Sequence, residues 1–132
     1  MTVLTNGSKA PDFSLPNQQG KVTSLKDAKD KWLVLYFYPK DDTPGCTIEA
    51  IDFTKLATDF QKAGTIVWGV SPDSGNSHCG FIAKHGLSIT LLSDVEKTVL
   101  LLYGAWGKKK FMGREYMGVL RSTFLIDPVG KI

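Results

Sequence analysis

Two apolar runs separated by a helical segment constrain the fold of this chain more than any other feature. Residues 31–39 (KWLVLYFYP) and 65–72 (TIVWGVSP) are continuous and rich in β-branched and aromatic side chains, which is typical of strands buried on both faces of a parallel sheet. Gly64 precedes the second run as a helix-ending glycine. Between the runs, apolar residues recur at helical spacing: Phe53, Leu56, Ala57 and Phe60. Together these segments predict a β-α-β unit.

The rest of the chain continues the alternation of strands and helices. We expect a β-hairpin over residues 13–25, with its turn at NQQG, and strands over residues 89–94 and 121–127. Residues 73–85 form a predicted helix that ends at Gly86. Strands that alternate with helices predict an α/β fold, in which helices cover both faces of a central sheet.

Two further segments are predicted from local signals. Ser93 and Glu96 have the Ser-x-x-Glu spacing of a capping box, which predicts that a helix begins there. Residues 104–118 contain four glycines and the basic run GKKK. We expect this stretch to be a solvated loop.

Composition limits the classes of function that the chain can have. The chain has 132 residues, 42% hydrophobic and 22% charged, which suits one domain with an apolar core. It contains no run of about 18 apolar residues, and its start, MTVLTNGSKAPDF, lacks the apolar centre of a signal peptide. We therefore expect a cytoplasmic protein that does not bind membranes. A net charge of +3 with one short basic run does not predict a nucleic-acid surface.

The two cysteines, Cys46 and Cys79, are too few for a disulfide framework or a zinc site, and no CxxC pair occurs. A single cysteine is most often a small buried hydrophobe. Cys46 differs because turn-forming residues precede it and a predicted helix follows it. The free N–H groups and positive end of a helix favour a thiolate and can hold an oxygen-bearing substrate. An inert core cysteine and a reactive thiol both remain open at this point.

The residues before Cys46 also carry a resemblance. Pro39, Thr43 and Cys46 form P-x-x-x-T-x-x-C directly after an apolar strand, which resembles the active-site motif of peroxiredoxins. The sequence DDTPGCTIEA is similar to that of the peroxiredoxin Q subgroup, also called bacterioferritin comigratory protein. The segment SKAPDFSLPNQQGKVTSL resembles the N-terminal hairpin of the family, and GVSPDSGNSH, LLSD and LRSTFLID resemble its later landmarks. The resemblance therefore covers essentially all of the chain.

The resemblance implies a thioredoxin-like fold, with a central mixed sheet flanked by helices and an N-terminal β-hairpin. It implies a thiol-dependent peroxidase in which the Cys46 thiolate reduces hydrogen peroxide or an alkyl hydroperoxide and becomes a sulfenic acid. Thr43 would hydrogen-bond the peroxide and the thiolate, and Pro39 would shield the pocket from water. No metal or organic cofactor is implied.

The resemblance also implies roles for charged and backbone groups. Arg121, which opens RSTFLID, matches the arginine of the family and would stabilise the thiolate and the charge that develops during O–O cleavage. Glu49 would orient Arg121. The backbone N–H groups of Gly45 and Cys46 would hold the peroxide oxygens.

The chain departs from the subgroup in its second cysteine. Many members carry a resolving cysteine where Ile51 stands here, and others carry one that aligns with Ile82, one helical turn after Cys79. Cys79 could therefore form a disulfide with Cys46 after local unfolding. Alternatively, the enzyme uses one cysteine, and thioredoxin, glutaredoxin or a small thiol attacks the sulfenic acid.

Three interpretations concern the whole chain. Residues 1–132 are expected to form a single thioredoxin-like peroxiredoxin domain that lacks the last strand and C-terminal helix of the family. We expect a monomer, with a dimer as the alternative. A peroxide sensor that relays oxidation to a partner protein by thiol–disulfide exchange is the alternative to an enzyme, because it would use the same Cys46 chemistry.

Overall fold

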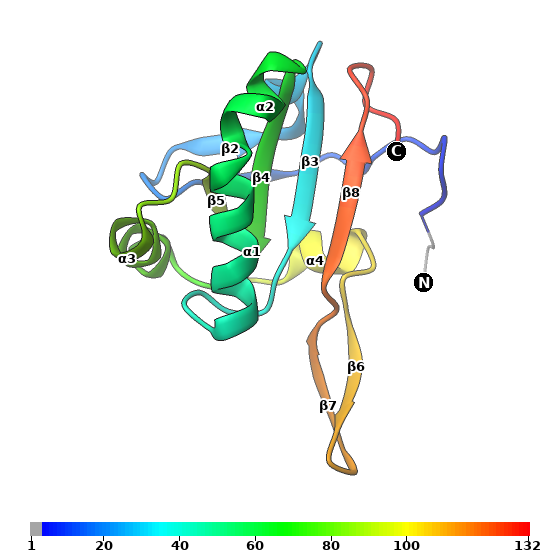
Figure 1. Cartoon of the computed structure of the whole chain (residues 1–132). Helices are drawn as coiled ribbons and strands as arrows, with labels where there is room; N and C mark the ends of the chain where they lie inside the picture. The colour runs from blue at the N-terminus through cyan, green and yellow to red at the C-terminus, as the bar shows by residue number, and fades with distance from the viewer. Residues whose placement is uncertain (1–3) are drawn as a thin grey trace.

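The computed structural model describes residues 4–132 and centres on a four-stranded mixed sheet in the order β5-β4-β3-β8 (Figure 1). β3 (Trp32–Phe37) pairs in parallel with β4 (Thr65–Ser71) and antiparallel with β8 (Ser122–Ile126). β5 (Thr90–Ser93) extends the sheet in parallel beside β4. The predicted β-α-β unit and the predicted strands at these positions are confirmed.

The remaining elements surround this sheet or project from it. In chain order they are β1 (Ser14–Pro16), β2 (Val22–Ser24), the short 3-10 helix η1 (Leu25–Ala28), α1 (Pro44–Lys55), α2 (Ala57–Lys62), α3 (Gly75–His85), α4 (Thr98–Leu102), β6 (Trp106–Phe111) and β7 (Arg114–Val119). β1 and β2 form the predicted N-terminal hairpin. Within residues 4–132, no helix is long and apolar enough to cross a membrane.

The alternating side chains of β3 divide the core into two layers. Leu33, Leu35 and Phe37 are fully buried in a cluster with residues of α4 and of the N-terminal segment. On the opposite face, Tyr36 and the adjoining Tyr38 pack with apolar residues of α1 and α3. Figure 1 shows α1 in front of the sheet and α4 behind its lower end. Burial on both faces explains why this strand is apolar at every position.

The helix between β3 and β4 differs from its prediction. We expected one helix with an apolar stripe through Leu56, but the structure has two helices, and Leu56 between them is 47% exposed. The buried face of α1 is formed instead by Cys46 and Ala50, each 1% exposed, and the half-buried Phe53 continues this line. The predicted stripe omitted Cys46, which is itself the first core residue of the helix. Gly64 ends the segment with a positive φ of 68°.

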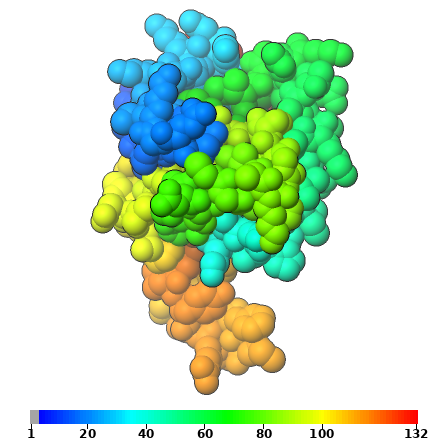
Figure 2. All heavy atoms as spheres, turned by 90° about the vertical axis from the view of Figure 1, so that its left-hand side faces the viewer, coloured from blue at the N-terminus to red at the C-terminus, as the bar shows by residue number. Residues whose placement is uncertain are grey.

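The loop predicted over residues 104–118 is wrong. β6 and β7 pair antiparallel there and project as a narrow arm from the body of the protein (Figures 1 and 2). Their two-residue turn consists of Met112 and Gly113, both with positive φ, as the tight turns of twisted hairpins require. A methionine gives no signal for that conformation, so the turn was not predicted.

The capping box predicted at Ser93 is also wrong. Ser93 is the last residue of β5, and α4 begins only at Thr98. The carboxylate of Asp94 accepts a hydrogen bond from the backbone N–H of Leu100 at 2.7 Å. Lys97 turns the chain into the helix with a φ of 64°.

We expect Leu35→Ala to lower the free energy of unfolding by about 2–5 kcal/mol, because Leu35 is fully buried in the centre of β3. Urea denaturation followed by circular dichroism measures this change. Val95→Ala is the control, since Val95 is 54% exposed and should change the stability by less than about 0.5 kcal/mol. Equal effects of the two substitutions would contradict the two-layer core.

Candidate active site

Cys46 lies in the first turn of α1, immediately after the segment that leaves the end of β3. Thr43 is the N-cap residue and Pro44 occupies the first turn of the helix. The hydroxyl of Thr43 donates to the carbonyl of Lys40 at 2.9 Å and does not cap the helix. Because proline has no N–H, the free donors of this turn are the backbone N–H groups of Gly45 and Cys46.

The sulfur of Cys46 is held between this helix end and a guanidinium group. Arg121 precedes β8, and its Nη2 donates to Sγ of Cys46 at 3.2 Å. Its Nη1 donates to Oε1 of Glu49 at 2.7 Å. Glu49 follows Cys46 by three residues, so both lie on one face of α1. This places a fixed positive charge beside the sulfur, which favours the thiolate.

The ionisation of Arg121 and Glu49 reflects burial as well as pairing. Burial acts to lower the pKa of Arg121, but the hydrogen bond to Cys46 and the nearby Glu49 together raise that pKa above its ordinary value. Burial raises the pKa of Glu49, and Arg121 opposes this effect. Arg121 therefore stays protonated, and part of its charge is directed at the sulfur.

Sheet register explains how a residue so distant in sequence reaches Cys46. Phe37 at the end of β3 pairs with Ser122 at the start of β8, so Arg121 lies beside the point where the chain turns toward α1. Pro39 is half-buried at this turn. A Cβ added to Gly45 would lie 3.5 Å from Nη2 of Arg121, which shows that the guanidinium lies directly over the helix end.

A cleft of about 440 Å³ opens beside Arg121 and Glu49, the ion pair that contacts Cys46. Ile48 and Leu56 in this cleft are 62% and 47% exposed, and they give it an apolar wall next to the charged pair. Its lining residues are Gly45, Ile48, Glu49, Asp52, Phe53, Leu56 and Arg121.

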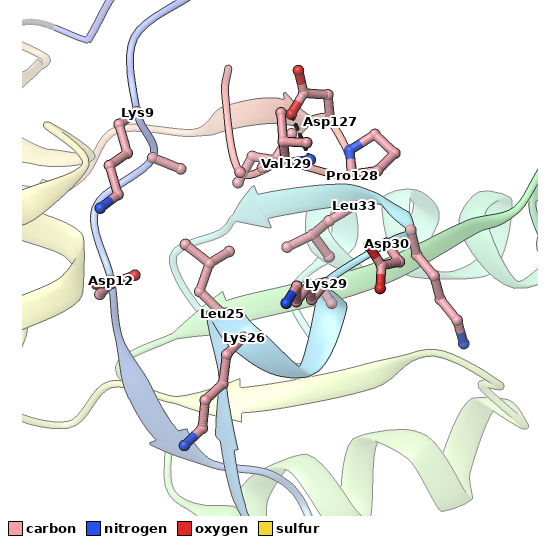
Figure 3. Close-up of a pocket in the computed structure, with 15 residues that line it drawn as sticks. Lys9, Asp12, Leu25, Lys26, Lys29, Asp30, Leu33, Asp127, Pro128 and Val129 are labelled. Carbon is pink, nitrogen blue, oxygen red and sulfur yellow. Dashed lines mark hydrogen bonds between the residues drawn. The ribbon is translucent and has the colours of Figure 1, made fainter.

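A second cavity of about 310 Å³ lies at the other end of the sheet (Figure 3). Leu33 near the start of β3 and Ile126 at the end of β8 contribute to it, whereas Cys46 follows the end of β3. Figure 3 shows Lys9, Lys26 and Lys29 around its rim. This cavity is therefore separate from the cysteine site.

The two cysteines are free thiols in different surroundings. Cys46 is buried in the cluster that also includes Ile51 and Ile82 as half-buried members. Cys79 is exposed, and its Sγ donates to the carbonyl of Gln18, in the turn of the N-terminal hairpin, at 2.8 Å. The structure thus brings Pro39, Thr43, Gly45, Cys46, Glu49 and Arg121 together, whereas the thiol of Cys79 is directed at the N-terminal hairpin.

Sequence analysis missed a polar cluster behind the cysteine turn. Asp41, Asp73 and His78 have ligand atoms within 4.8 Å of one another, an arrangement that could hold a metal ion. In this structure the carboxylate of Asp41 instead accepts hydrogen bonds from Tyr38, Ser77 and His78. Asp41 lies four residues after the end of β3, and nothing in the sequence connected it with His78.

With the geometry described, comparison with known proteins decides the family. The model of the AhpC/TSA family matches residues 6–132. The chain belongs to this family. Peroxiredoxin Bcp of Bacillus subtilis is 48% identical over 126 residues, covering 96% of this chain and 80% of the relative. Peroxiredoxin Bcp of Escherichia coli is 43% identical over all 132 residues, which span 85% of the relative.

Solved structures give the same result. A cysteine-to-serine variant of peroxiredoxin Q from Xanthomonas campestris superposes with a TM-score of 0.88 at 41% identity, over 98% of this chain and 83% of that one. The Xylella fastidiosa PrxQ variant gives a TM-score of 0.93 at 34% identity, over 100% and 84%. The predicted thioredoxin-like fold and the resemblance to peroxiredoxin Q are confirmed. The chain is a peroxiredoxin and a thiol-dependent peroxidase, and the comparisons favour this enzyme over the sensor alternative.

We expect Arg121→Ala to slow the reaction of Cys46 with peroxide by about 10²-fold, the loss typical when one preorganised donor is removed. Stopped-flow fluorescence at increasing peroxide concentrations measures this rate constant. Arg114→Ala, in the exposed strand β7, is the matched control, and an unchanged rate in Arg121→Ala would remove Arg121 from the site.

Proposed function

We propose that Cys46 is the peroxidatic residue of this thiol-dependent peroxidase, and that the 3.2 Å contact between its Sγ and Nη2 of Arg121 activates it. Glu49 holds the other arm of the guanidinium at 2.7 Å and so fixes its direction. Pro39, half-buried at the turn, limits access of water to the sulfur. The contact with Arg121 is the observation that carries the proposal.

The chemical step follows from this arrangement. The Cys46 thiolate attacks the terminal oxygen of the peroxide, the O–O bond breaks, and the electron pair leaves with the other oxygen. That oxygen takes a proton from solvent and departs as water or an alcohol, while Cys46 becomes a sulfenic acid. Arg121 and the N–H groups of Gly45 and Cys46 stabilise the negative charge as it moves between the oxygens.

Thr43 has a narrower role in this proposal than the resemblance implied. Its hydroxyl proton is directed at the carbonyl of Lys40, so its oxygen is free to accept a hydrogen bond but not to donate one to the sulfur in this arrangement. The oxygen can therefore accept the O–H of the incoming hydroperoxide. This would orient the terminal oxygen toward Cys46.

We also propose that alkyl hydroperoxides bind with their organic group in the cleft beside Arg121 and Glu49. The exposed side chains of Ile48 and Leu56 line it, and an organic group seated there would remove their apolar surface from water. Hydrogen peroxide has no group that could make this contact. The cleft therefore favours organic peroxides.

An external thiol resolves the sulfenic acid in this proposal. The thiol of Cys79 hydrogen-bonds to the N-terminal hairpin, and apolar Ile51 and Ile82 occupy the positions where the subgroup carries its resolving cysteines. The sulfenic acid and an external R–SH would give a mixed disulfide and water. A second thiol would then release Cys46 as a thiol and leave with the first as a disulfide.

Thioredoxin, glutaredoxin or a small thiol is the reductant that this chemistry requires, and a cytoplasmic location would supply it. The interpretation of residues 1–132 as one domain without the last strand and helix of the family stays a prediction, as does the monomeric state. The chain spans 80–85% of the length of the two curated relatives named above.

We expect Cys46→Ser to abolish peroxide reduction, whereas Cys79→Ser should retain it, because only Cys46 contacts Arg121. Intact-mass measurement after one equivalent of hydrogen peroxide, with and without dimedone, tests both steps. A dimedone adduct on Cys46 in the unmodified sequence and in Cys79→Ser would support the one-cysteine cycle. A loss of two hydrogens that Cys79→Ser prevents would overturn it, and residual activity in Cys46→Ser would overturn the assignment of Cys46.

Removal of the apolar wall should change substrate preference. We expect the double substitution Ile48→Ala and Leu56→Ala to lower the ratio of kcat/KM for cumene hydroperoxide to that for hydrogen peroxide by roughly tenfold, since each buried CH₂ contributes about 0.8 kcal/mol. Leu101→Ala with Leu102→Ala on α4 is the matched control, because these leucines are 58% and 45% exposed away from the cleft. An unchanged ratio would show that the organic group binds elsewhere.

A further inference from the structure

Because Cys46 is buried, the proposed cycle requires a movement of the chain around it that the chemical steps alone do not provide. Cys46 is 1% exposed, and Nη2 of Arg121 lies 3.2 Å from its sulfur. A thiol carried by another molecule must later approach the same sulfur from the side opposite its bond to oxygen. The segment around Cys46 therefore has to move after oxidation, and the contacts that hold this segment decide how readily it moves.

The segment between β3 and α1 is held mainly at Asp41, whose side chain is 3% exposed. Its carboxylate accepts hydrogen bonds from the hydroxyl of Tyr38 at 2.6 Å, the hydroxyl of Ser77 at 2.7 Å and Nδ1 of His78 at 2.8 Å. We call these four residues the Asp41 cluster. Burial acts to raise the pKa of Asp41, but the hydrogen bonds from His78, Tyr38 and Ser77 hold it below its ordinary value.

His78 links the Asp41 carboxylate to β5. Its Nδ1 lies 2.8 Å from Oδ2 of Asp41, and its Nε2 lies 3.0 Å from the backbone carbonyl of Leu92. The fully buried ring is therefore held at both nitrogen atoms.

The Asp41 cluster joins the cysteine turn to α3. His78 and Ser77 belong to α3, whereas Asp41 lies in the turn that leads to Thr43 and the first turn of α1. In Figure 2 α3 (yellow-green) lies beside this turn (cyan). The next residue, Asp42, makes a second but exposed connection, to Lys84 and His85 of α3. The backbone N–H of Asp41 also donates to Asp73 at 2.7 Å.

We propose that the Asp41 cluster is a positioning device that holds the Cys46 turn in its peroxide-reactive arrangement and must open before an external thiol can reach the Cys46 sulfenic acid. This inference rests on the proposed function of Cys46. The cluster contacts neither the sulfur nor the substrate, so it acts through the position of the turn. Its opening would release the first turn of α1 from α3 and expose the oxidised sulfur to the thiol that reduces it.

The two half-reactions respond to this equilibrium in opposite directions. Reaction with peroxide needs the closed arrangement, because Arg121 and the free N–H groups meet the sulfur only there. Formation of the mixed disulfide with the external thiol, with release of water, needs the open arrangement. Weakening the Asp41 cluster raises the open population, so it should slow the first half-reaction and accelerate the second.

Asp41→Asn tests this prediction, because asparagine has nearly the same shape but removes the negative charge that faces Tyr38, Ser77 and His78. We expect the rate constant for sulfenic acid formation to fall, and that for attack of β-mercaptoethanol on the sulfenic acid to rise, each by roughly tenfold, as for loss of one charged hydrogen bond. Stopped-flow measurement of each half-reaction separately gives the two constants. Amide hydrogen exchange should accelerate in residues 40–48 without a matching increase in β3.

Ser77→Ala is the second variant, in case Asp41→Asn does not fold. It removes one hydrogen bond to the carboxylate and keeps the contact between Asp41 and His78, so smaller changes in the same two directions are expected. Asp59→Asn, an exposed carboxylate on α2, is the control and should change neither rate constant. A merely structural role would slow both half-reactions together or alter neither, and either result in both variants would overturn the proposal.

This outcome can be separated from failure of the proposed function. If Cys46 is not the peroxidatic residue, Cys46→Ser retains activity and no dimedone adduct forms on Cys46. If Cys46 is peroxidatic but the Asp41 cluster does not control its exposure, the adduct forms normally and the two rate constants in Asp41→Asn keep their original ratio.

Discussion

The rest of the structure depends on the burial of β3 on both faces. Leu33, Leu35 and Phe37 pack in one layer of the core, and Tyr36 with the adjoining Tyr38 packs in the other. The strand therefore cannot slip or tilt without disturbing both layers. Its parallel pairing with β4 and antiparallel pairing with β8 are fixed by this burial. As a result, the end of β3 and the start of β8 meet at one end of the sheet, where Cys46 and Arg121 face each other.

The chemistry of the site comes from placing a sulfur where two sources of positive potential converge. The first turn of α1 supplies the free N–H groups of Gly45 and Cys46. They are not capped by Thr43, because its hydroxyl is directed at Lys40. Arg121 supplies a full charge at 3.2 Å. The same burial that strengthens these interactions hides the sulfur from a second thiol. A catalytic cycle therefore needs a fold that is rigid during peroxide reduction and locally mobile afterwards, and the contacts of Asp41 lie where those two demands meet.

The errors of sequence prediction have identifiable physical causes. The helix predicted to begin at Ser93 and the loop predicted around GKKK were wrong because of turns at Lys97 and Met112. Both residues have a positive φ, a conformation that lysine and methionine do not ordinarily favour. Sequence signals for such turns come from glycine and asparagine, so other residues in that conformation go unrecognised. The apolar stripe of α1 was misplaced because it began at Phe53, whereas the buried face of the helix already begins at Cys46 and Ala50.

The sequence by itself determined the strands of the central sheet and of the N-terminal hairpin, and the position of Cys46 at a helix N-terminus. These features depend on apolar periodicity, prolines and glycines within a few residues of each other. A motif and a family resemblance named the residues expected around the sulfur, but their contacts were decided by the tertiary structure. Arg121 is 75 positions from Cys46, and His78 is 37 positions from Asp41. Only strand register and helix packing bring such residues within hydrogen-bonding distance, and no local pattern in the chain records that distance.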